Sequence, residues 1–427
     1  MDQTDTAEEQ AFRLEVRSWL EDNLTGAFAG LRGLGGSGKD LEGHDERRAW
    51  DRHLAAHGWT CVGWPREYGG RGLSLQQQVI FHEEYARADA PVRVNHLGEE
   101  LLGPTLIAFG TQAQKDRFLP RIRSVEELWC QGYSEPQAGS DLANVQTRAR
   151  LDEAAGQWVL DGQKVWTSLA QFADWIFVLA RTEPGSERHR GLSFLLVPTA
   201  QEGVEVRGIE QLTGGAEFNE VFFTGARTDA DLVVGEAGDG WRVAMALLGF
   251  ERGVSTLGQQ VGFRRELDAL VALARDNGTF DDPVVRDRLA RADVELEVIR
   301  LNALRTLSEA DTAEQHAGAP SIAKLLWAGW HRSLGELAML VRGPDSLLTG
   351  PDYDLDAWQR LFLFSRADTI YGGSDEIQRN ILAERVLGLP REGRREGRRE
   401  ERREEPGEQP GEQPGEQPGE QRREVRP

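Results

Sequence analysis

Two stretches decide how this chain is interpreted: SEPQAGSD, at Ser134–Asp141, and GQKVWTS, at Gly162–Ser168. The first has the Pro and Gly of a tight turn, and Gly139 permits a close approach of the backbone to another molecule. The second lies in a β-rich segment and carries one large flat ring, Trp166, close to a hydroxyl. Together they bring hydroxyls, backbone N–H groups and an aromatic ring into neighbouring segments, which suits the binding of a flavin and an anionic thioester.

A third stretch, YGGSDEIQRN, lies near the C-terminus at Tyr371–Asn380. In this order the three stretches resemble the two flavin-binding signatures and the closing motif of the acyl-CoA dehydrogenases, and the resemblance covers about residues 8 to 390. It implies an α+β fold with an N-terminal helical domain, a middle β-barrel-like domain and a C-terminal four-helix bundle.

The hydrophobic pattern predicts the same order of elements. Helical periodicity begins at Phe12, Val16 and Leu20, and it gives way to short alternating runs with turn residues between about 127 and 233. Long helical periods return after Gly240. We therefore predict domains at 1–126, 127–237 and 238–390. The predicted helices include 76–88, 112–122, 241–262, 264–276, 284–307, 319–340 and one that follows Ser374.

The last segment, 391–427, contains four copies of Pro-Gly-Glu-Gln after an Arg/Glu-rich run. Low hydrophobicity and regular Pro and Gly prevent such a segment from building a core, so we predict a disordered tail. Two alternatives stay open: the Arg/Glu run extends the last helix, or the tail binds a partner.

Composition excludes several classes of protein. A net charge of -21 disfavours a nucleic acid partner, and no apolar run reaches the roughly 20 residues of a membrane span. The N-terminus lacks a signal pattern, so we expect a cytoplasmic protein. Cys61 and Cys130 have no metal-ligand spacing and are interpreted as buried thiols. We expect no metal.

The glycine-rich stretch GLGGSGKD, at Gly33–Asp40, is close to a phosphate-binding P-loop. That motif needs Ser or Thr after the Lys, and Asp40 would repel phosphate there. We predict a surface loop.

The resemblance implies FAD as the cofactor. Ser134 corresponds to a family residue that hydrogen-bonds the flavin, Trp166 to one that stacks near it, and Ser168 to a donor to ring atom N5. It assigns FAD contacts to Gln131, Tyr133, Ser134, Gly139, Ser140, Trp166, Thr167, Ser168, Ser374, Asp375 and Glu376, and substrate contacts to Ser140, Arg252 and Gly373. From the residues alone, a capped turn at 131–141 that leads into a strand and a core position for Trp166 stay possible.

Two positions in the sequence are candidates for the catalytic base. In many family members a Glu follows the Tyr of the closing motif, but here that position is Gly372. A second subset carries the base on the helix after the β domain, and LLGFERG at 247–253 matches that pattern with Glu251 as the base and Arg252 after it. The alternative is a solvated charge pair. A backbone N–H at Gly372 would still donate to the thioester carbonyl.

The resemblance thus implies FAD-dependent α,β-dehydrogenation of an acyl-CoA in fatty acid β-oxidation. Glu251 removes the pro-R α-proton, the β-hydrogen leaves as hydride to flavin N5, and the product is a trans-2-enoyl-CoA. The expected partners are an electron-transferring flavoprotein and further copies of the chain, in a dimer or homotetramer.

Two other functions stay open. A flavin oxidase or monooxygenase on the same scaffold would reoxidise rapidly in air. A non-catalytic flavin- or acyl-CoA-binding subunit of a hetero-oligomer is favoured by two departures from the family pattern, at Arg275–Thr279 and Leu340–Pro344.

Overall fold

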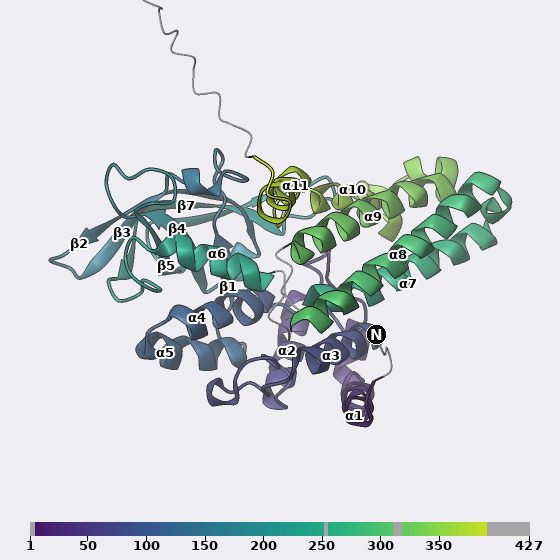
Figure 1. The fold of residues 1–427 in the computed structure, drawn as a ribbon, viewed down its shortest axis with the longest axis horizontal. Coiled ribbons are helices and arrows are strands. Elements are labelled where there is room, and N and C mark those ends of the chain that lie inside the picture. Colours follow the sequence, from purple (N-terminus) through teal and green to yellow (C-terminus); the bar gives the residue numbers. More distant parts are fainter. Residues whose placement is uncertain (1–4, 252–254, 311–317, 391–427) are drawn as a thin grey trace, which may run out of the picture.

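The computed structural model describes residues 5–251, 255–310 and 318–390. Figure 1 shows three parts: a sheet at the left, long helices at the right, and N-terminal helices below both. This arrangement confirms the predicted α+β architecture. The tail at 391–427 lies outside the described residues, so its predicted disorder stays a prediction.

The N-terminal part contains α1 (Ala7–Asn23), α2 (His44–Ala56), α3 (Leu75–Arg87), α4 (Gly103–Phe109) and α5 (Gln112–Arg123). Three of these helices begin at a Ser or Thr whose hydroxyl accepts a backbone N–H, namely Thr6, Ser74 and Thr111. The helix α2 was not predicted, because it buries the polar residues Arg47 and Asp51 and so lacks a clear apolar stripe.

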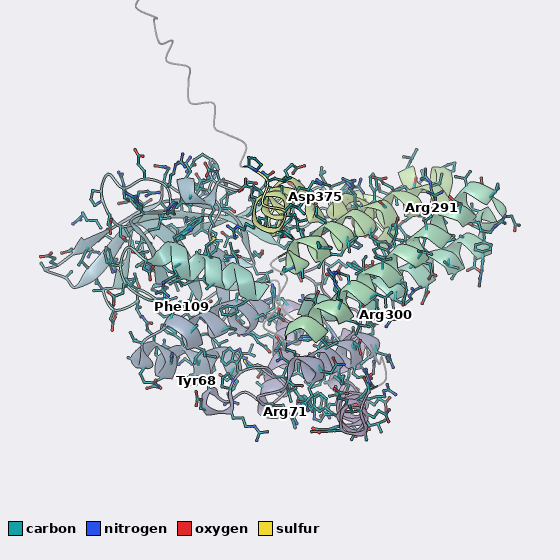
Figure 2. All side chains as sticks on the ribbon, in the orientation of Figure 1. Tyr68, Arg71, Phe109, Arg291, Arg300 and Asp375 are labelled. Atoms are coloured by element: carbon teal, nitrogen blue, oxygen red, sulfur yellow. The ribbon has the colours of Figure 1, made fainter. Side chains whose placement is uncertain are left out.

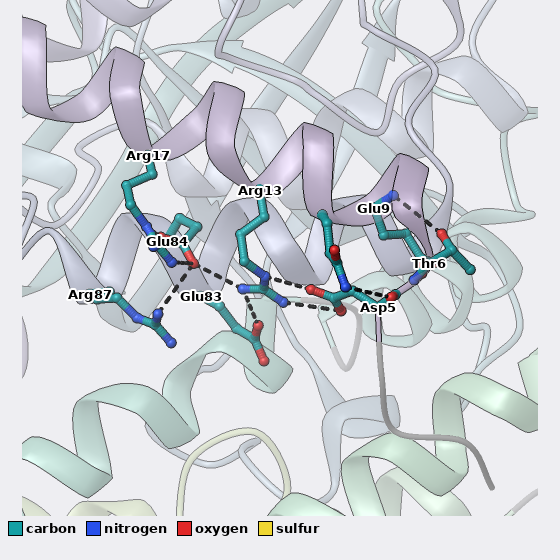
Figure 3. Close-up of polar contacts among 9 residues, drawn as sticks. Asp5, Thr6, Glu9, Arg13, Arg17, Glu83, Glu84 and Arg87 are labelled. Atoms are coloured by element: carbon teal, nitrogen blue, oxygen red, sulfur yellow. Dashed lines mark hydrogen bonds and ion pairs between the residues drawn. The ribbon is translucent and has the colours of Figure 1, made fainter.

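A buried carboxylate fastens α1 to α3 (Figure 3). The side chain of Glu84, on α3, is 1% exposed and accepts hydrogen bonds from Arg13 at 2.9 Å and from Arg17 at 2.8 Å. Burial alone would raise the pKa of Glu84, but the hydrogen bonds from Arg17 and Arg13 outweigh it and hold the pKa below its usual value. The carboxylate therefore stays charged and holds α1 against α3, a helix that also lines the cavity described below.

The sheet contains β1 (Trp129–Gly132), β2 (Arg148–Asp152), β3 (Gln157–Ser168), β4 (Trp175–Arg181), β5 (Leu192–Pro198), β6 (Val204–Ile209) and β7 (Phe218–Asp229). The strand order is β1-β4-β2-β3-β7-β6, and β5 pairs with β4. Most pairs are antiparallel, whereas β4 runs parallel to β1 and β2. The apolar runs of β4 and β5 are buried, and α6 packs against both strands.

The C-terminal part contains α6 (Gly240–Glu251), α7 (Ser255–Asp276), α8 (Pro283–Ala310), α9 (Ala319–Arg342), α10 (Ala357–Asp368) and α11 (Asp375–Ile381). The predicted helix boundary between residues 262 and 264 is wrong. The helix α7 continues through it, because Phe263 is an apolar residue of the bundle core and is 4% exposed. The unpredicted α10 packs on α9 and completes the bundle with α7 and α8.

None of the described helices is long and apolar enough to cross a membrane. Within the same residues, no cluster of three or more His, Cys, Asp or Glu could hold a metal ion. Cys61 and Cys130 are both buried free thiols, as predicted.

Candidate functional site

A buried ion pair joins the stretches Ser134–Asp141 and Gly162–Ser168. The Lys164 ammonium lies 2.8 Å from the Glu135 carboxylate, and the two side chains are 0% and 2% exposed. The same ammonium donates to the backbone carbonyls of Tyr133 at 3.1 Å and Leu179 at 2.8 Å. Burial lowers the pKa of Lys164 to about 8, against the opposing influence of Glu135. One cation on β3 therefore ties together the turn that follows β1 and the strand β4.

The Glu135 carboxylate also shapes the turn itself. It accepts the backbone N–H groups of Gln146 at 2.5 Å and Thr147 at 2.9 Å, and the backbone of Glu135 pairs with that of Ala138. Contacts to Gln146, Thr147, Lys164 and Ala138 therefore fix the turn at Glu135, beyond what a simple capped loop would have. The turn leaves Gly139 exposed, and a Cβ added there would meet nothing within 4 Å, so a ligand has room to approach.

The residues that flank this turn have different surroundings. Ser140 is exposed and Ser134 and Gln131 are half-buried, so all three side chains are partly accessible. The ring of Tyr133 lies in the core, 6.1 Å from that of Phe177, which leaves only its backbone for a ligand. The predicted contacts by Ser134 and Ser140 are thus compatible with this geometry.

Trp166 is not a core residue. Its side chain is 56% exposed, and its backbone has a φ of 60°, a left-handed conformation that is uncommon for a large residue. A register shift in β3 between Lys164 and Thr167 leaves this ring on the surface, and the Thr167 side chain is buried. An exposed indole held in a strained conformation is an expected feature of a ligand platform. Any contact from Thr167 would come from its backbone.

A cavity of about 1080 Å³ lies between the N-terminal helices and the bundle. Its walls come from residues 33–39, α3, the segment 89–100, α7, α9, α10 and the turn at Tyr371 and Gly372. Charged groups such as Arg93, Glu100 and Arg265 alternate with aromatic rings such as Phe263 and Trp327.

The glycine-rich stretch is a loop of turns, as predicted, with Gly33 and Ser37 exposed, and it also forms part of this wall. Gly35 lies against the buried guanidinium of Arg47, and a Cβ at Gly35 would come within 2.4 Å of that group. Gly38 is buried and donates its N–H to Glu217 at 2.9 Å. Gly35 allows the chain to pass closely over the guanidinium of Arg47, a contact that no local sequence pattern reveals.

Glu217 also links the cavity to the strand that carries Trp166. Ser168, at the end of β3, pairs with Phe218, the next residue after Glu217. The residues of β3 do not themselves line the cavity, so the candidate site has two sides: the turn and strand of the sheet, and the cavity with Gly372.

Gly372 has the geometry of a backbone donor. It lines the cavity with a φ of 63°, and among the described residues its N–H donates no hydrogen bond. Gln378 donates to its carbonyl at 3.0 Å and to that of Gly373 at 3.4 Å, which fixes the orientation of both peptide groups.

The predicted contacts after this turn lie on α11. Ser374 caps the helix, and Figure 2 shows Asp375 at its start, between the sheet and the bundle in this view. One oxygen of the Asp375 carboxylate is buried with no hydrogen-bond partner within the described ranges. Glu376 is exposed, and hydrogen bonds from its own N–H and from Ser374 lower its pKa.

Glu251 is the last residue of α6, a helix whose inner face buries Val243, Ala244 and Leu247. Its side chain lies outside the described part of the molecule, and so does the whole of Arg252. The roles of these two residues stay predictions.

Known protein families match almost the whole described chain. The N-terminal, middle and C-terminal domains of acyl-CoA dehydrogenase match residues 6–126, 130–226 and 238–387. The chain belongs to the acyl-CoA dehydrogenase family. It is therefore an FAD-dependent oxidoreductase, as predicted.

Similar proteins include the acyl-CoA dehydrogenases IpdE1 of Mycobacterium tuberculosis and Mycolicibacterium smegmatis. These are 66% and 62% identical, and each alignment covers 90% of this chain and 99% of the relative. Among solved structures, the Tcur3481-Tcur3483 steroid ACAD is 31% identical with a TM-score of 0.79, and the ChsE4-ChsE5 complex from Mycobacterium tuberculosis is 31% identical with a TM-score of 0.75. Each covers 92% of this chain, and 100% of the solved chain is matched.

The dehydrogenase has a second polar cluster that the sequence analysis missed. His331, on α9, lies 2.5 Å from the Asp368 carboxylate and 3.1 Å from that of Glu266. Burial lowers the pKa of His331, but the two hydrogen bonds more than compensate and raise it to about 9. These residues come from three helices and form no motif, so only the tertiary structure brings them together.

This pKa gives the stability of the dehydrogenase a predictable pH dependence. The folded pKa of His331 lies above the ordinary value of 6.5, so its contribution is complete below about pH 6.5 and is lost as pH rises through 9. We expect urea unfolding to show a decline of about 3 kcal/mol over that interval. His331→Gln should remove most of this decline. An equally steep decline in the variant would contradict the assignment.

Proposed function

We propose that this acyl-CoA dehydrogenase oxidises the α,β-bond of a thioester whose acyl group is a large, oxygen-bearing ring system of the steroid type. The observation that carries the proposal is the N–H of Gly372, which donates to no group of the described chain and lies in the wall of a 1080 Å³ cavity. A pocket of this volume lies just above the range of about 300–1,000 Å³ that is usual for small-molecule sites, and a bulky acyl group would fill it.

The composition of the wall supports the same substrate class. Flat rings such as Trp327 and Trp358 alternate with Lys39, His96 and Arg360. Aromatic faces suit a rigid ring system, whereas the charged and imidazole groups would be left without partners by a plain hydrocarbon chain. We therefore favour a ring-containing acyl group over the straight chain of fatty acid β-oxidation. The steroid ACAD among the solved relatives has a name that agrees with this choice.

The chemistry follows from the donor at Gly372. A thioester carbonyl placed against its N–H gains negative charge as the α-proton leaves, and a fixed donor stabilises that charge. We assign removal of the α-proton to Glu251, with Arg252, Gly373 and Ser140 in contact with the thioester. Bound FAD supplies the acceptor for the hydride that leaves the β-carbon. The product is a trans-2-enoyl-CoA.

The residues of the sheet fit that cofactor. The exposed ring of Trp166, the open space at Gly139 and the partly accessible hydroxyls of Ser134 and Ser168 would hold a flat ring with polar edges. Gln131, Tyr133, Thr167, Ser374, Asp375 and Glu376 complete the proposed set of contacts. The buried Asp375 oxygen, which has no partner in the part of the chain that the structure describes, is a further acceptor for a ligand donor.

Two proposals concern partners. The first is an electron-transferring flavoprotein, which would accept the electrons after substrate oxidation. Both 31%-identical solved relatives carry the names of two chains, which favours assembly with a second, different chain over the predicted homo-oligomer.

An anaerobic absorbance titration tests the function. Purified protein with bound FAD is titrated with CoA thioesters of a steroid-ring acid, a branched acid and a straight-chain acid. We expect the flavin band to bleach with the first. Rapid return of the band in air, without an acceptor protein, would support the oxidase alternative. Absence of bleaching with every thioester would contradict the proposal and favour a non-catalytic subunit.

A further inference from the structure

We propose that Asp368 is a positioning residue for the dehydrogenation. Its carboxylate, held between His331 and Tyr371, fixes the turn that presents the Gly372 N–H to the thioester. This inference rests on the proposed function, because it needs Gly372 to be the donor.

The carboxylate of Asp368 is clamped from both sides. One oxygen accepts from His331 at 2.5 Å, and the other accepts from the Tyr371 hydroxyl at 2.7 Å. The side chain is 1% exposed and closes α10, so the clamp sits where the helix ends and the turn begins. Lys324 donates to the backbone carbonyl of the same residue. Asp368 is thus held at three atoms, all within four residues of Gly372.

The turn after Asp368 depends on this clamp for its direction. Tyr371 donates its N–H to Ala367 at 3.0 Å, and Asp375 donates its N–H to Thr369 at 3.1 Å. Both glycines between them have positive φ values, 63° for Gly372 and 88° for Gly373, and glycine is intrinsically free there. On the C-terminal side of the turn, Gln378 donates to the carbonyls of both glycines. On the N-terminal side, the hydrogen bond from the Tyr371 hydroxyl to Asp368 holds the residue before Gly372.

The cluster is suited to positioning rather than to contact with a substrate. Both Asp368 oxygens and both ring nitrogens of His331 already have protein partners. The group contains two anions, Asp368 and Glu266, and two cations, His331 and Lys324. Since these charges balance, the clamp adds no net negative charge beside the enolate that forms at Gly372.

The test measures the donor directly, with acetoacetyl-CoA as the probe. The α-proton of this thioester is acidic, and its enolate absorbs in the near ultraviolet. A fixed donor at the carbonyl therefore lowers the apparent pKa of the bound probe. We expect the wild-type holoenzyme to lower it, and Asp368→Asn to weaken the enolisation constant by about 10-fold or more. Tyr371→Phe, which removes one hydroxyl, should shift it in the same direction by less.

Arg342→Gln is the matched control. It breaks an ion pair with Asp356 in the same domain, and neither residue lines the cavity. This variant should leave the apparent pKa of the probe unchanged. Enolisation equal to wild type in both Asp368→Asn and Tyr371→Phe would overturn the inference while leaving the dehydrogenase function intact. A wild-type protein that binds the probe without lowering its pKa would also overturn it, and the flavin titration then decides the function separately. Tyr371→Phe keeps the test decisive if Asp368→Asn does not fold.

Discussion

Lys164→Met is expected to abolish flavin binding and to lower the free energy of unfolding by about 3–5 kcal/mol, because it leaves the Glu135 carboxylate buried without its cation. The Lys164 side chain is 0% exposed and donates to three oxygens, two in the turn after β1 and one on β4. Without it, the turn at 134–141 and the strand that carries Trp166 lose their common anchor. Urea unfolding of the FAD-free proteins measures the first effect, and flavin absorbance after gel filtration with excess FAD measures the second.

A double variant separates charge from geometry. Lys164→Met with Glu135→Gln removes both buried charges, so it should recover part of the lost stability without recovering flavin binding. Arg207→Met is the control, since Arg207 pairs with Glu205 on the exposed face of the same sheet, at 57% and 59% exposure. It should change neither property. Full flavin binding by Lys164→Met would show that the turn holds its shape without the ion pair.

Several features of the dehydrogenase could be predicted from the sequence because their signals are local. The apolar runs that became β4 and β5 are continuous, and α3 and α5 each follow a residue that caps the helix. Gly372 could be recognised by its place in a contiguous motif. In each case neighbouring residues determine the structure, so a single sequence contains the information.

The missed features depend on residues that are far apart in the chain. The glycine-rich stretch became a cavity wall because Arg47 and Glu217 approach it, and neither lies in its local pattern. The clamp on Asp368 needs Glu266 and His331, which are contributed by two other helices. The helix α2 could not be predicted for a related reason. Its buried face includes charged residues, so the sequence shows no continuous apolar stripe there.

The catalytic base gives the second large effect. Glu251→Gln should lower the rate of flavin bleaching by a reacting acyl-CoA about 10²–10⁴-fold, because the amide cannot accept the α-proton. The flavin spectrum of the resting protein should stay unchanged, since the assigned FAD contacts lie elsewhere. Stopped-flow absorbance under anaerobic conditions measures the rate of this single step and separates it from reoxidation.

Four other carboxylates line the cavity: Asp89, Glu100, Glu266 and Asp368. Asp89 is paired with Arg265, and both oxygens of Asp368 are hydrogen-bonded, so Glu100 and Glu266 are the ones to test for the same role. Glu266 is already paired with His331 at 3.1 Å, so it is a poor candidate for a proton acceptor. Glu266→Gln and Glu100→Gln should each slow bleaching far less than Glu251→Gln does. If Glu251→Gln bleaches at the wild-type rate and one of the other two variants does not, the base belongs to the cavity wall instead of the end of α6. Loss of the rate in all three variants would instead indicate that the total charge of the cavity, not one carboxylate, controls the step.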